Sequence, residues 1–373
     1  MSIFSLRRFV SSVAALLMLS ASASAAVVTK TIQVGNFPVR LAVDELTNKI
    51  YVANYRGASV TVIDGATNHP HTIGTAPFPN NVAVNSVTNK IYVNHAEVND
   101  LTIIDGATNS LHRIALTSDN SRRGTSGLGL NPVTNRIYVS GGSLRNGPTV
   151  FVVDGFTNSI TQVKAGSGQI VVNSITNKVY VCNGGMLINN SLSMIDGASN
   201  SMQTVQLETS CVALGLNSAS NLIYVGNNSY GPIGPNPHSR VAVVDGATNT
   251  VTYDDVGQVP YSIAINEVTD KAFVANLRSN NVTVIDGKTD LTQTVHVGKG
   301  PFFVAVNPVT NKIFVADSED NAVTVIDGAT LNTTQVKVGK FPVGIAVNSK
   351  TNLIYVTNRD SDNVTVIDGS TLP

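Results

Sequence analysis

A short tripeptide, Val-Asp-Gly or Ile-Asp-Gly, occurs eight times along the chain, and this repetition constrains the fold more than any other feature. Its aspartates are Asp64, Asp105, Asp154, Asp196, Asp245, Asp286, Asp327 and Asp368. Successive copies lie 41 to 49 residues apart. Residues 26–373 therefore divide into eight units of about 43 residues. No stretch is left for a second domain, so we predict one domain over residues 26–373.

Each unit contains four short apolar segments separated by turn residues. In the unit that spans residues 301–339, the segments are 303–306, 312–315, 322–326 and 334–338. Segments this short have the length of strands rather than helices. The Asn-Pro and Asp-Gly pairs between them are turn signals. Four strands per unit at this period are typical of one blade of a β-propeller, so we predict an all-β chain with eight four-stranded blades.

One segment in each unit carries a small residue at its centre. These residues are Ala42, Ala83, Gly129, Gly215, Ala264, Ala305 and Ala346, and Val171 is the exception. Blades converge toward the axis of a propeller, where crowded neighbouring sheets favour small side chains. We therefore assign these segments to the innermost strands of a closed ring. An open stack of repeats has no such convergence and would not require small residues there.

The two ends of the chain complement each other. Residues 27–34 match the fourth strand of a unit, whereas the last unit stops at residues 368–373, after its third strand. We expect the N-terminal strand to complete the last blade, because closure of the ring removes exposed sheet edges. The alternative is a seven-bladed ring with one displaced repeat.

The first 25 residues have the pattern of a secretory signal peptide. Arg7 and Arg8 precede a mostly apolar stretch at residues 10–19, and residues 23–25 offer a small-residue cleavage site. The apolar stretch is shorter than the ~20 residues that a membrane-spanning helix needs, which argues against the alternative of a retained anchor. We expect export to the periplasm, the cell surface or the medium, with no membrane span in the mature chain.

A tetrapeptide at the end of the second strand of several units resembles the YVTN β-propeller repeats. Its literal form is Tyr355-Val356-Thr357-Asn358, and looser copies begin at Tyr51, Tyr180 and Tyr224. Two units depart from it, with Phe273 or Phe314 in place of the tyrosine. The resemblance implies an exported propeller used for binding, and it supplies no catalytic residue.

The charge and the motifs of the chain argue against several functions. Its 373 residues include 24 Lys and Arg against 24 Asp and Glu, so loss of Arg7 and Arg8 leaves a net charge of −2. A chain without a basic excess does not favour nucleic acid as a partner. It has no Cys-x-x-Cys-His haem site, no P-loop and no Gly-x-Ser-x-Gly elbow, so we expect no cofactor.

Long insertions break the repeat on one face of the predicted ring. The loop from the second to the third strand of an up-and-down blade shares this face with the connection to the next blade. The insertions are residues 118–126, 141–148, 184–190 and 227–240, all in units two to five. Loops on a rigid scaffold commonly carry binding residues. We therefore predict binding through the loop-rich face of these units.

The candidate binding residues lie on this face, around the expected axial opening. They are Arg40, Asn81, His95, Arg122, Arg123, Gln169, Tyr230, His238, Arg240 and Phe303, with Tyr55, Ser262 and Phe302 beside them. Polar groups at an opening with aromatic walls suit a small polar ligand, a peptide or a protein. For each of these residues, an ordinary solvated surface is an equally good interpretation.

The sequence does not support a metal site. His95 and Glu97 lack a second nearby histidine. The acidic residues Asp317, Glu319 and Asp320 lack the pattern of an EF-hand, and we interpret them as a solvated charge cluster.

The two cysteines, Cys182 and Cys211, leave two alternatives. Export permits oxidation to a disulfide. Two buried thiols fit equally well, because partners on facing sheets would be about 10 Å apart.

These features favour a binding or scaffold protein, acting as a monomer, over an enzyme. The alternative is a metal-dependent lyase or a lactonase-like hydrolase with its site at the axial entrance. The eight Asp-Gly carboxylates do not support the enzyme, because Asx-turn hydrogen bonds explain their recurrence.

Overall fold

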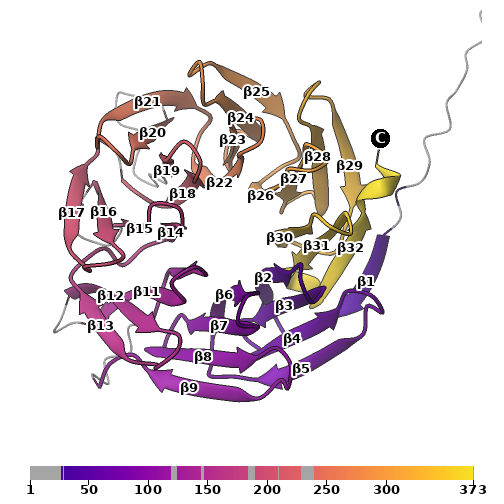
Figure 1. Ribbon diagram of the computed structural model, residues 1–373. Helices are drawn as coiled ribbons and strands as arrows, with labels where there is room; N and C mark the ends of the chain where they lie inside the picture. The colour runs from indigo at the N-terminus through magenta and orange to yellow at the C-terminus, as the bar shows by residue number, and fades with distance from the viewer. Residues whose placement is uncertain are drawn as a thin grey trace, which may run out of the picture.

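Eight sheets of four antiparallel strands form a closed ring in a computed structural model of the chain (Figure 1). The structure describes residues 27, 29–118, 124–143, 147–183, 190–208, 210–227 and 239–372. Within these residues the only helices are two short 3-10 turns, η1 (Arg359–Ser361) and η2 (Gly369–Thr371). None of the described helices has the length and apolar character needed to cross a bilayer. The predictions of an all-β fold and of eight blades are confirmed.

The strands of each blade are ordered from the axis outward (Figure 1). The innermost strands are β2 (Pro38–Asp44), β6 (Pro79–Asn85), β10 (Leu128–Asn131), β14 (Ile170–Asn173), β18 (Ala213–Asn217), β22 (Pro260–Asn266), β26 (Pro301–Asn307) and β30 (Pro342–Asn348). The second strands are β3 (Lys49–Asn54), β7 (Lys90–His95), β11 (Arg136–Ser143), β15 (Lys178–Cys182), β19 (Leu222–Gly226), β23 (Lys271–Asn276), β27 (Lys312–Asp317) and β31 (Leu353–Asn358). The third strands are β4 (Ser59–Asp64), β8 (Asp100–Asp105), β12 (Gly147–Asp154), β16 (Ser191–Asp196), β20 (Ser239–Asp245), β24 (Asn281–Asp286), β28 (Ala322–Asp327) and β32 (Asn363–Asp368). The outer strands are β5 (Pro70–Gly74), β9 (Leu111–Ala115), β13 (Ile160–Val163), β17 (Met202–Gln206), β21 (Val251–Val256), β25 (Thr292–His296), β29 (Thr333–Lys337) and β1 (Thr29–Gln33).

The N-terminal strand closes the ring. Strand β1 pairs antiparallel with β32 in the blade ordered β1-β32-β31-β30, with Thr31 opposite Thr365 and Ile32 opposite Val364. Blade eight is therefore built from both ends of the described chain, as the sequence predicts. Blades one to seven each come from one continuous stretch.

The tyrosine of the repeated tetrapeptide fills the space between neighbouring blades. Tyr51, on β3, is fully buried and packs with Ile91 and Val93 of β7 in the next blade. Near the axis this space narrows. A Cβ atom on Gly215 would lie 2.5 Å from Cγ2 of Ile263, which explains the need for a small residue at the centre of β18.

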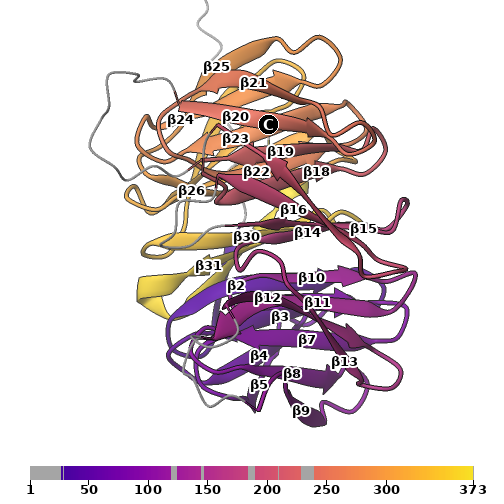
Figure 2. The same cartoon turned by 90° about the vertical axis from the view of Figure 1, so that its left-hand side faces the viewer.

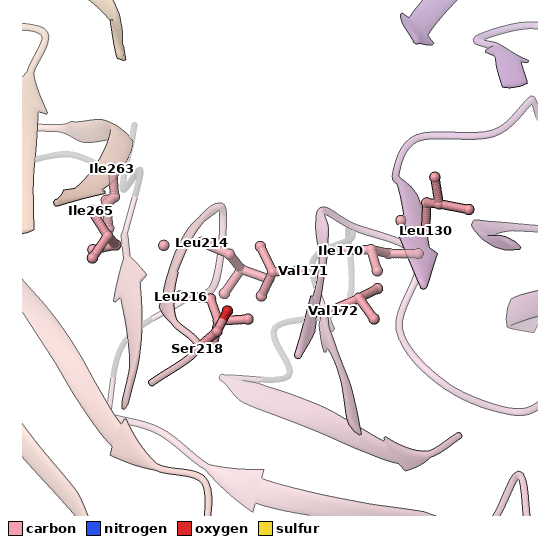
Figure 3. A pocket seen from close by; sticks show the side chains of 11 residues that line it. Leu130, Ile170, Val171, Val172, Leu214, Leu216, Ser218, Ile263 and Ile265 are labelled. Atoms are coloured by element: carbon pink, nitrogen blue, oxygen red, sulfur yellow. The ribbon is translucent and has the colours of Figure 1, made fainter. Parts of the chain in front are cut away.

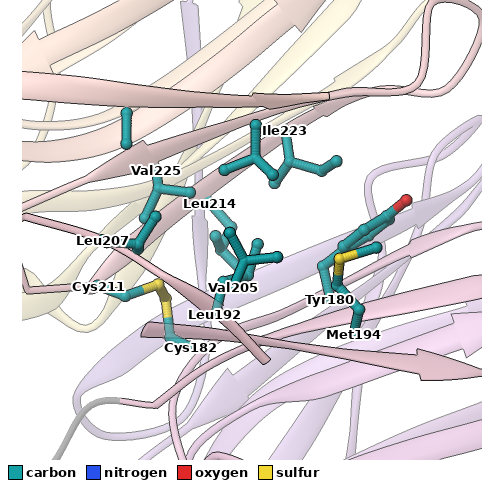
Figure 4. Close-up of a cluster of buried hydrophobic side chains, with 12 residues drawn as sticks. Tyr180, Cys182, Leu192, Met194, Val205, Leu207, Cys211, Leu214, Ile223 and Val225 are labelled. Atoms are coloured by element: carbon teal, nitrogen blue, oxygen red, sulfur yellow. A yellow bond between two sulfur atoms is a disulfide. The ribbon is translucent and has the colours of Figure 1, made fainter. Parts of the chain in front are cut away.

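A disulfide bond joins Cys182, at the end of β15, to Cys211, just before β18. Both residues are buried, and their Cα atoms are 5.2 Å apart. Figure 4 shows the bond beside the apolar side chains of Leu192, Val205 and Leu207. The partners are closer than two facing strands would be, because Cys211 lies in the connection that runs inward from blade four to blade five.

The ring has two distinct faces, and Figure 2 shows it from the side. We call the face with the blade-to-blade connections and the second-to-third strand loops the top face. The bottom face carries the Asp-Gly turns. There, Asp64 accepts hydrogen bonds from the backbone N–H groups of Ala66 (3.0 Å) and Thr67 (2.8 Å). These bonds hold the pKa of the Asp64 carboxyl below its usual range, and they give the repeated aspartate its structural role.

Candidate functional site

Part of the predicted loop-rich face lies outside the described residues. This applies to Arg122, Arg123, Tyr230 and His238 among the candidates, and to most of the four insertions. The remaining candidates are placed, and they fall into three groups: residues at the axial opening, a buried histidine, and a peripheral arginine.

Four candidates at the axial opening connect the inner strands of neighbouring blades. Asn81 of β6 donates to the Ser126 carbonyl oxygen (2.8 Å), and Gln169 before β14 accepts from the Leu214 N–H (2.8 Å). The remaining two bonds continue the series around the ring. Ser262 of β22 accepts from the Val304 N–H (3.3 Å), and Arg40 of β2 donates to the Val343 carbonyl oxygen (3.3 Å). These side chains therefore tie adjacent blades together at the top of the channel.

His95 is buried and not on the surface where the sequence places it. It ends β7 with 0% of its surface exposed. Its Nδ1 lies 3.1 Å from the Pro77 carbonyl oxygen, and its Nε2 lies 2.9 Å from Thr102 Oγ1. Since a carbonyl can only accept, Nδ1 carries the proton and Nε2 accepts from the threonine. Burial lowers the pKa of His95 to about 4, so the ring is neutral and occupied by structural bonds.

Arg240 and Phe303 lie in different parts of the top face. Arg240, on the third strand of blade five, pairs with Glu208 (2.5 Å) and stacks over the ring of Tyr253 at 4.7 Å. It is therefore peripheral. Phe303, on β26, lies at the axial opening, where the guanidinium of Arg40 sits 4.4 Å from its ring centroid.

The blades are not equivalent at the top face. The innermost strands of blades six, seven, eight, one and two each begin at a proline and contain a register shift within the first three residues; these strands are β22, β26, β30, β2 and β6. Such β-bulges redirect side chains and are frequent beside functional sites. The shorter strands β10, β14 and β18 of blades three to five have no such shift.

A continuous row of aromatic and arginine side chains crosses these five blades on the top face. We call it the aromatic–arginine belt; its members are Tyr261, Phe302, Phe341, Arg359, Phe37, Tyr55 and Phe78. The ring centroids of Tyr261 and Phe302 are 4.5 Å apart, and those of Phe302 and Phe341 are 6.5 Å apart. Every member is partly exposed.

Arg359 joins the two halves of the belt. Its guanidinium lies 3.6 Å from the ring centroid of Phe341 and 4.9 Å from that of Phe37. The row then continues from Phe37 to Tyr55 at 6.0 Å and on to Phe78 at 5.3 Å. The belt is thus one connected surface rather than a set of separate rings.

Three phenylalanines of the belt adopt a left-handed backbone conformation. The φ angles of Phe37, Phe78 and Phe341 are 58°, 57° and 52°. Gly300 occupies the equivalent position in blade seven, with φ 65°, and the buried Val259 occupies it in blade six, with φ 58°. This conformation costs a bulky residue roughly 1–2 kcal/mol, a cost that glycine avoids. The aromatic ring at these positions is therefore not explained by the backbone.

Most residues of the belt were not predicted from the sequence. The available signal was the dipeptide Phe-Pro, whose phenylalanine directly precedes the innermost strand in three units, at Phe37, Phe78 and Phe341. Of the belt residues, only Tyr55 and Phe302 were among the predicted candidates.

The axial channel has an open recess on the side of blades three to six. A recess of about 450 Å³ is lined there mainly by aliphatic side chains from the innermost strands (Figure 3). They include Ile170, Val171, Leu214, Leu216 and Ile263.

Of the three acidic residues predicted to be solvated, Glu319 is exposed and Asp320 is partly exposed, but Asp317 is not solvated. Asp317 ends β27 with 0% of its surface exposed, and its Oδ2 accepts from Thr324 Oγ1 (2.5 Å). Burial raises the pKa of Asp317 to about 7. In the part of the chain that the structure describes, no three His, Cys, Asp or Glu side chains are grouped to hold a metal ion.

The fold and this face define a β-propeller whose top surface departs from the repeat. Solved structures with the same fold include Kuenenia stuttgartiensis hydrazine synthase, with a TM-score of 0.62, 16% identity, and coverage of 80% of this chain and 97% of that chain. Saccharomyces cerevisiae Sqt1 has a TM-score of 0.72 and 9% identity, and the match covers 91% of this chain and 97% of the Sqt1 chain. A streptogramin B lyase has a TM-score of 0.59 and 12% identity, and the match covers 91% of this chain and 97% of the lyase chain.

These likenesses concern the fold alone, because all three identities are low, and hydrazine synthase and streptogramin B lyase are names of two different enzymes. No protein-family model and no curated protein matches the sequence.

Proposed function

We propose that this chain is an exported, monomeric binding protein of the YVTN-repeat type, which engages a peptide or protein partner through its top face. The aromatic–arginine belt supplies the main contact on this face. Export is supported by the signal-peptide pattern of residues 1–25 and agrees with the disulfide, since disulfides persist in oxidising compartments.

The observation that carries the proposal is the retention of phenylalanine at strained positions. Phe37, Phe78 and Phe341 hold left-handed conformations at a position where blades six and seven carry Val259 and Gly300, so three of the five blades place a partly exposed ring there. Strain of this kind clusters at functional sites. Aromatic residues and arginine are also the residue types most enriched at protein interfaces. The predicted loops of blades two to five would border the same face.

The experiment compares glycine variants of the belt with a variant on the bottom face. Phe37→Gly and Phe341→Gly remove two rings without disturbing a backbone conformation that glycine prefers. Val309→Ser is the matched control, because Val309 is 75% exposed in a bottom-face turn. Mature protein is immobilised and used to select from a displayed library of random peptides, and the affinities of the selected peptides are then measured.

The proposal expects the wild type to enrich peptides whose affinity falls at least tenfold in the double glycine variant. The same peptides should bind the Val309→Ser variant unchanged. Enrichment of no peptide by the wild type, or equal binding by the belt variant, contradicts the proposal.

Nothing in the described residues favours the alternative, a metal-dependent lyase or lactonase-like hydrolase. Metal analysis of the purified mature protein decides between the two. A stoichiometric metal whose removal abolishes lactone hydrolysis or elimination would replace the binding proposal with the enzymatic one.

A further inference from the structure

Two guanidinium groups lie against the same ring of the aromatic–arginine belt. The guanidinium of Arg359 is 4.9 Å from the ring centroid of Phe37, and that of Arg56 is 4.2 Å from it. Arg359 has a carboxylate partner, because its Nε donates to Asp360 Oδ1 at 2.8 Å. Arg56 is exposed, and no Asp or Glu among the described residues forms an ion pair with it. The two arginines therefore differ in their capacity to bind a partner.

The contact with Phe37 orders Arg56 without using its hydrogen bonds. A cation over an aromatic ring is attracted by the charge distribution of the ring, and this attraction uses none of the five N–H donors of a guanidinium. A group that is ordered in advance loses less entropy when it binds. Arg56 is therefore prepared for an acceptor that the described part of this chain does not supply.

The carboxylates nearest to this part of the belt are occupied. Asp362 accepts from the Phe37 N–H (2.7 Å) through Oδ1 and from Asn36 Nδ2 (3.1 Å) through Oδ2. In blade seven, Asp320 accepts from the Lys299 N–H (2.7 Å). These bonds hold the connections in place, so neither carboxylate is available to compensate an exposed cation.

Two exposed carboxylates of the top face lie in other blades than Arg56. Glu319 lies over the connection into blade seven, where a Cβ atom on Gly300 would be 2.9 Å from its Cγ. Glu97 belongs to blade two and lies toward blade three, where a Cβ atom on Gly124 would be 2.3 Å from its backbone N. They can offset charges at the two ends of the belt but not at its centre.

Lys340 is a further exposed cation at the centre of the belt. It directly precedes Phe341, and it forms no ion pair with a described carboxylate. Arg56 and Lys340 therefore give the central part of the belt an unbalanced positive charge. Complementary charge is what steers and orients a partner on such a surface.

We propose that the partner of the belt is an acidic peptide segment, in which an Asp or Glu side chain pairs with Arg56 while a neighbouring apolar side chain packs on the rings. This inference rests on the proposed function, because it names the chemistry of the partner that the same face binds. A guanidinium binds a carboxylate through two parallel hydrogen bonds. The ring of Phe37 then serves two purposes, since it contacts the partner and orders the arginine.

The test uses peptides that the wild-type mature protein selects from a displayed library of random peptides. Selected peptides should be enriched in Asp and Glu over the unselected library. In calorimetric titration of one such peptide, replacement of its acidic residue by the corresponding amide should weaken binding at least about tenfold. Arg56→Gln should weaken the acidic peptide by the same factor and leave the amide peptide unchanged. Arg56→Lys should fall between the two, because lysine lacks the forked geometry.

Lys350→Gln is the matched control for charge. Lys350 is exposed in a bottom-face turn, so this variant removes one positive charge far from the belt. It should leave the affinity of the acidic peptide unchanged. Unchanged binding of the amide peptide by Arg56→Gln shows in addition that the belt itself is intact.

The outcomes separate this inference from the proposed function. Selected peptides that depend on Phe37 and Phe341 but carry no acidic residue, or that bind Arg56→Gln as tightly as the wild type, overturn the acidic partner and leave peptide binding in place. An equal loss in Lys350→Gln also overturns it, because general charge attraction would then explain the binding. Displacement of the peptide by single-stranded oligothymidylate overturns it in favour of nucleic acid. If the wild type selects no peptide, both proposals fail.

Discussion

Replacement of Asp317 by asparagine should make the protein more stable at neutral and alkaline pH. Asp317 ends the second strand of blade seven, a position held by Asn54, Asn276 and Asn358 in blades one, six and eight. Each of those asparagines donates its Nδ2 to a threonine on the third strand, at 2.8 to 2.9 Å. All four side chains leave one buried Oδ1 without a partner among the described residues. A neutral amide tolerates this better than a carboxylate does.

The magnitude follows from the pKa. Burial raises the pKa of Asp317 from 3.8 to about 7. The folded protein then holds a proton that the unfolded chain releases, so the free energy of unfolding falls as the pH rises from 4 to 7. At about 1.4 kcal/mol per pH unit, the total loss is about 4 kcal/mol. Asp317→Asn has no titrating group at this position and avoids the loss.

Urea denaturation of the wild type and of Asp317→Asn at pH 4 and pH 8 measures this effect. The difference in unfolding free energy between the two proteins should increase by about 4 kcal/mol from pH 4 to pH 8. The other carboxylates titrate in both proteins and cancel. Asn276→Asp is the matched control and should introduce a loss of the same sign in blade six. A difference that does not change with pH would refute the reasoning.

Three further variants test other parts of the structure. The wild type should lose unfolding free energy as the pH falls from 6.5 to 4, because His95 takes up a proton in the unfolded chain but not in the folded protein. In His95→Asn this loss should be smaller by about 3 kcal/mol, as measured by urea denaturation. The double variant Cys182→Ala, Cys211→Ala should lower the unfolding free energy by about 3–4 kcal/mol, because the disulfide links residues that are 29 positions apart in the chain. The stability of this variant should not change when a reductant is added. Gly215→Ala should cost about 1–3 kcal/mol by overpacking against Ile263, whereas Gly74→Ala, whose Cβ would meet nothing within 4 Å, should not destabilise; thermal melting compares the two.

The repeat itself made the fold predictable. The Asp-Gly turns are specified locally; Asp64, for example, accepts hydrogen bonds from the backbone N–H groups of the residues two and three positions later. Eight such turns at one period leave little freedom for the strands between them. The match of residues 27–34 to a fourth strand then indicated the closure that β1 and β32 form.

The site was less predictable, for two physical reasons. His95 and Asp317 look like surface residues in isolation, but they occupy the buried strand end where Asn54 stands in blade one. Alignment of the units with one another shows that these two residues share the buried position of Asn54, whereas their residue types alone do not. The belt depends on contacts between different blades and on left-handed conformations at Phe37, Phe78 and Phe341, which no local propensity favours.

Hydrogen–deuterium exchange with a bound peptide tests most directly whether the top face is the binding surface. A peptide selected by the wild-type protein should slow amide exchange in the top-face connections at residues 35–37, 76–78 and 339–341, which carry Phe37, Phe78 and Phe341. Exchange in the bottom-face turns at residues 44–48 and 307–311 should not change. Protection confined to those bottom turns, with the top-face connections unaffected, would contradict the account.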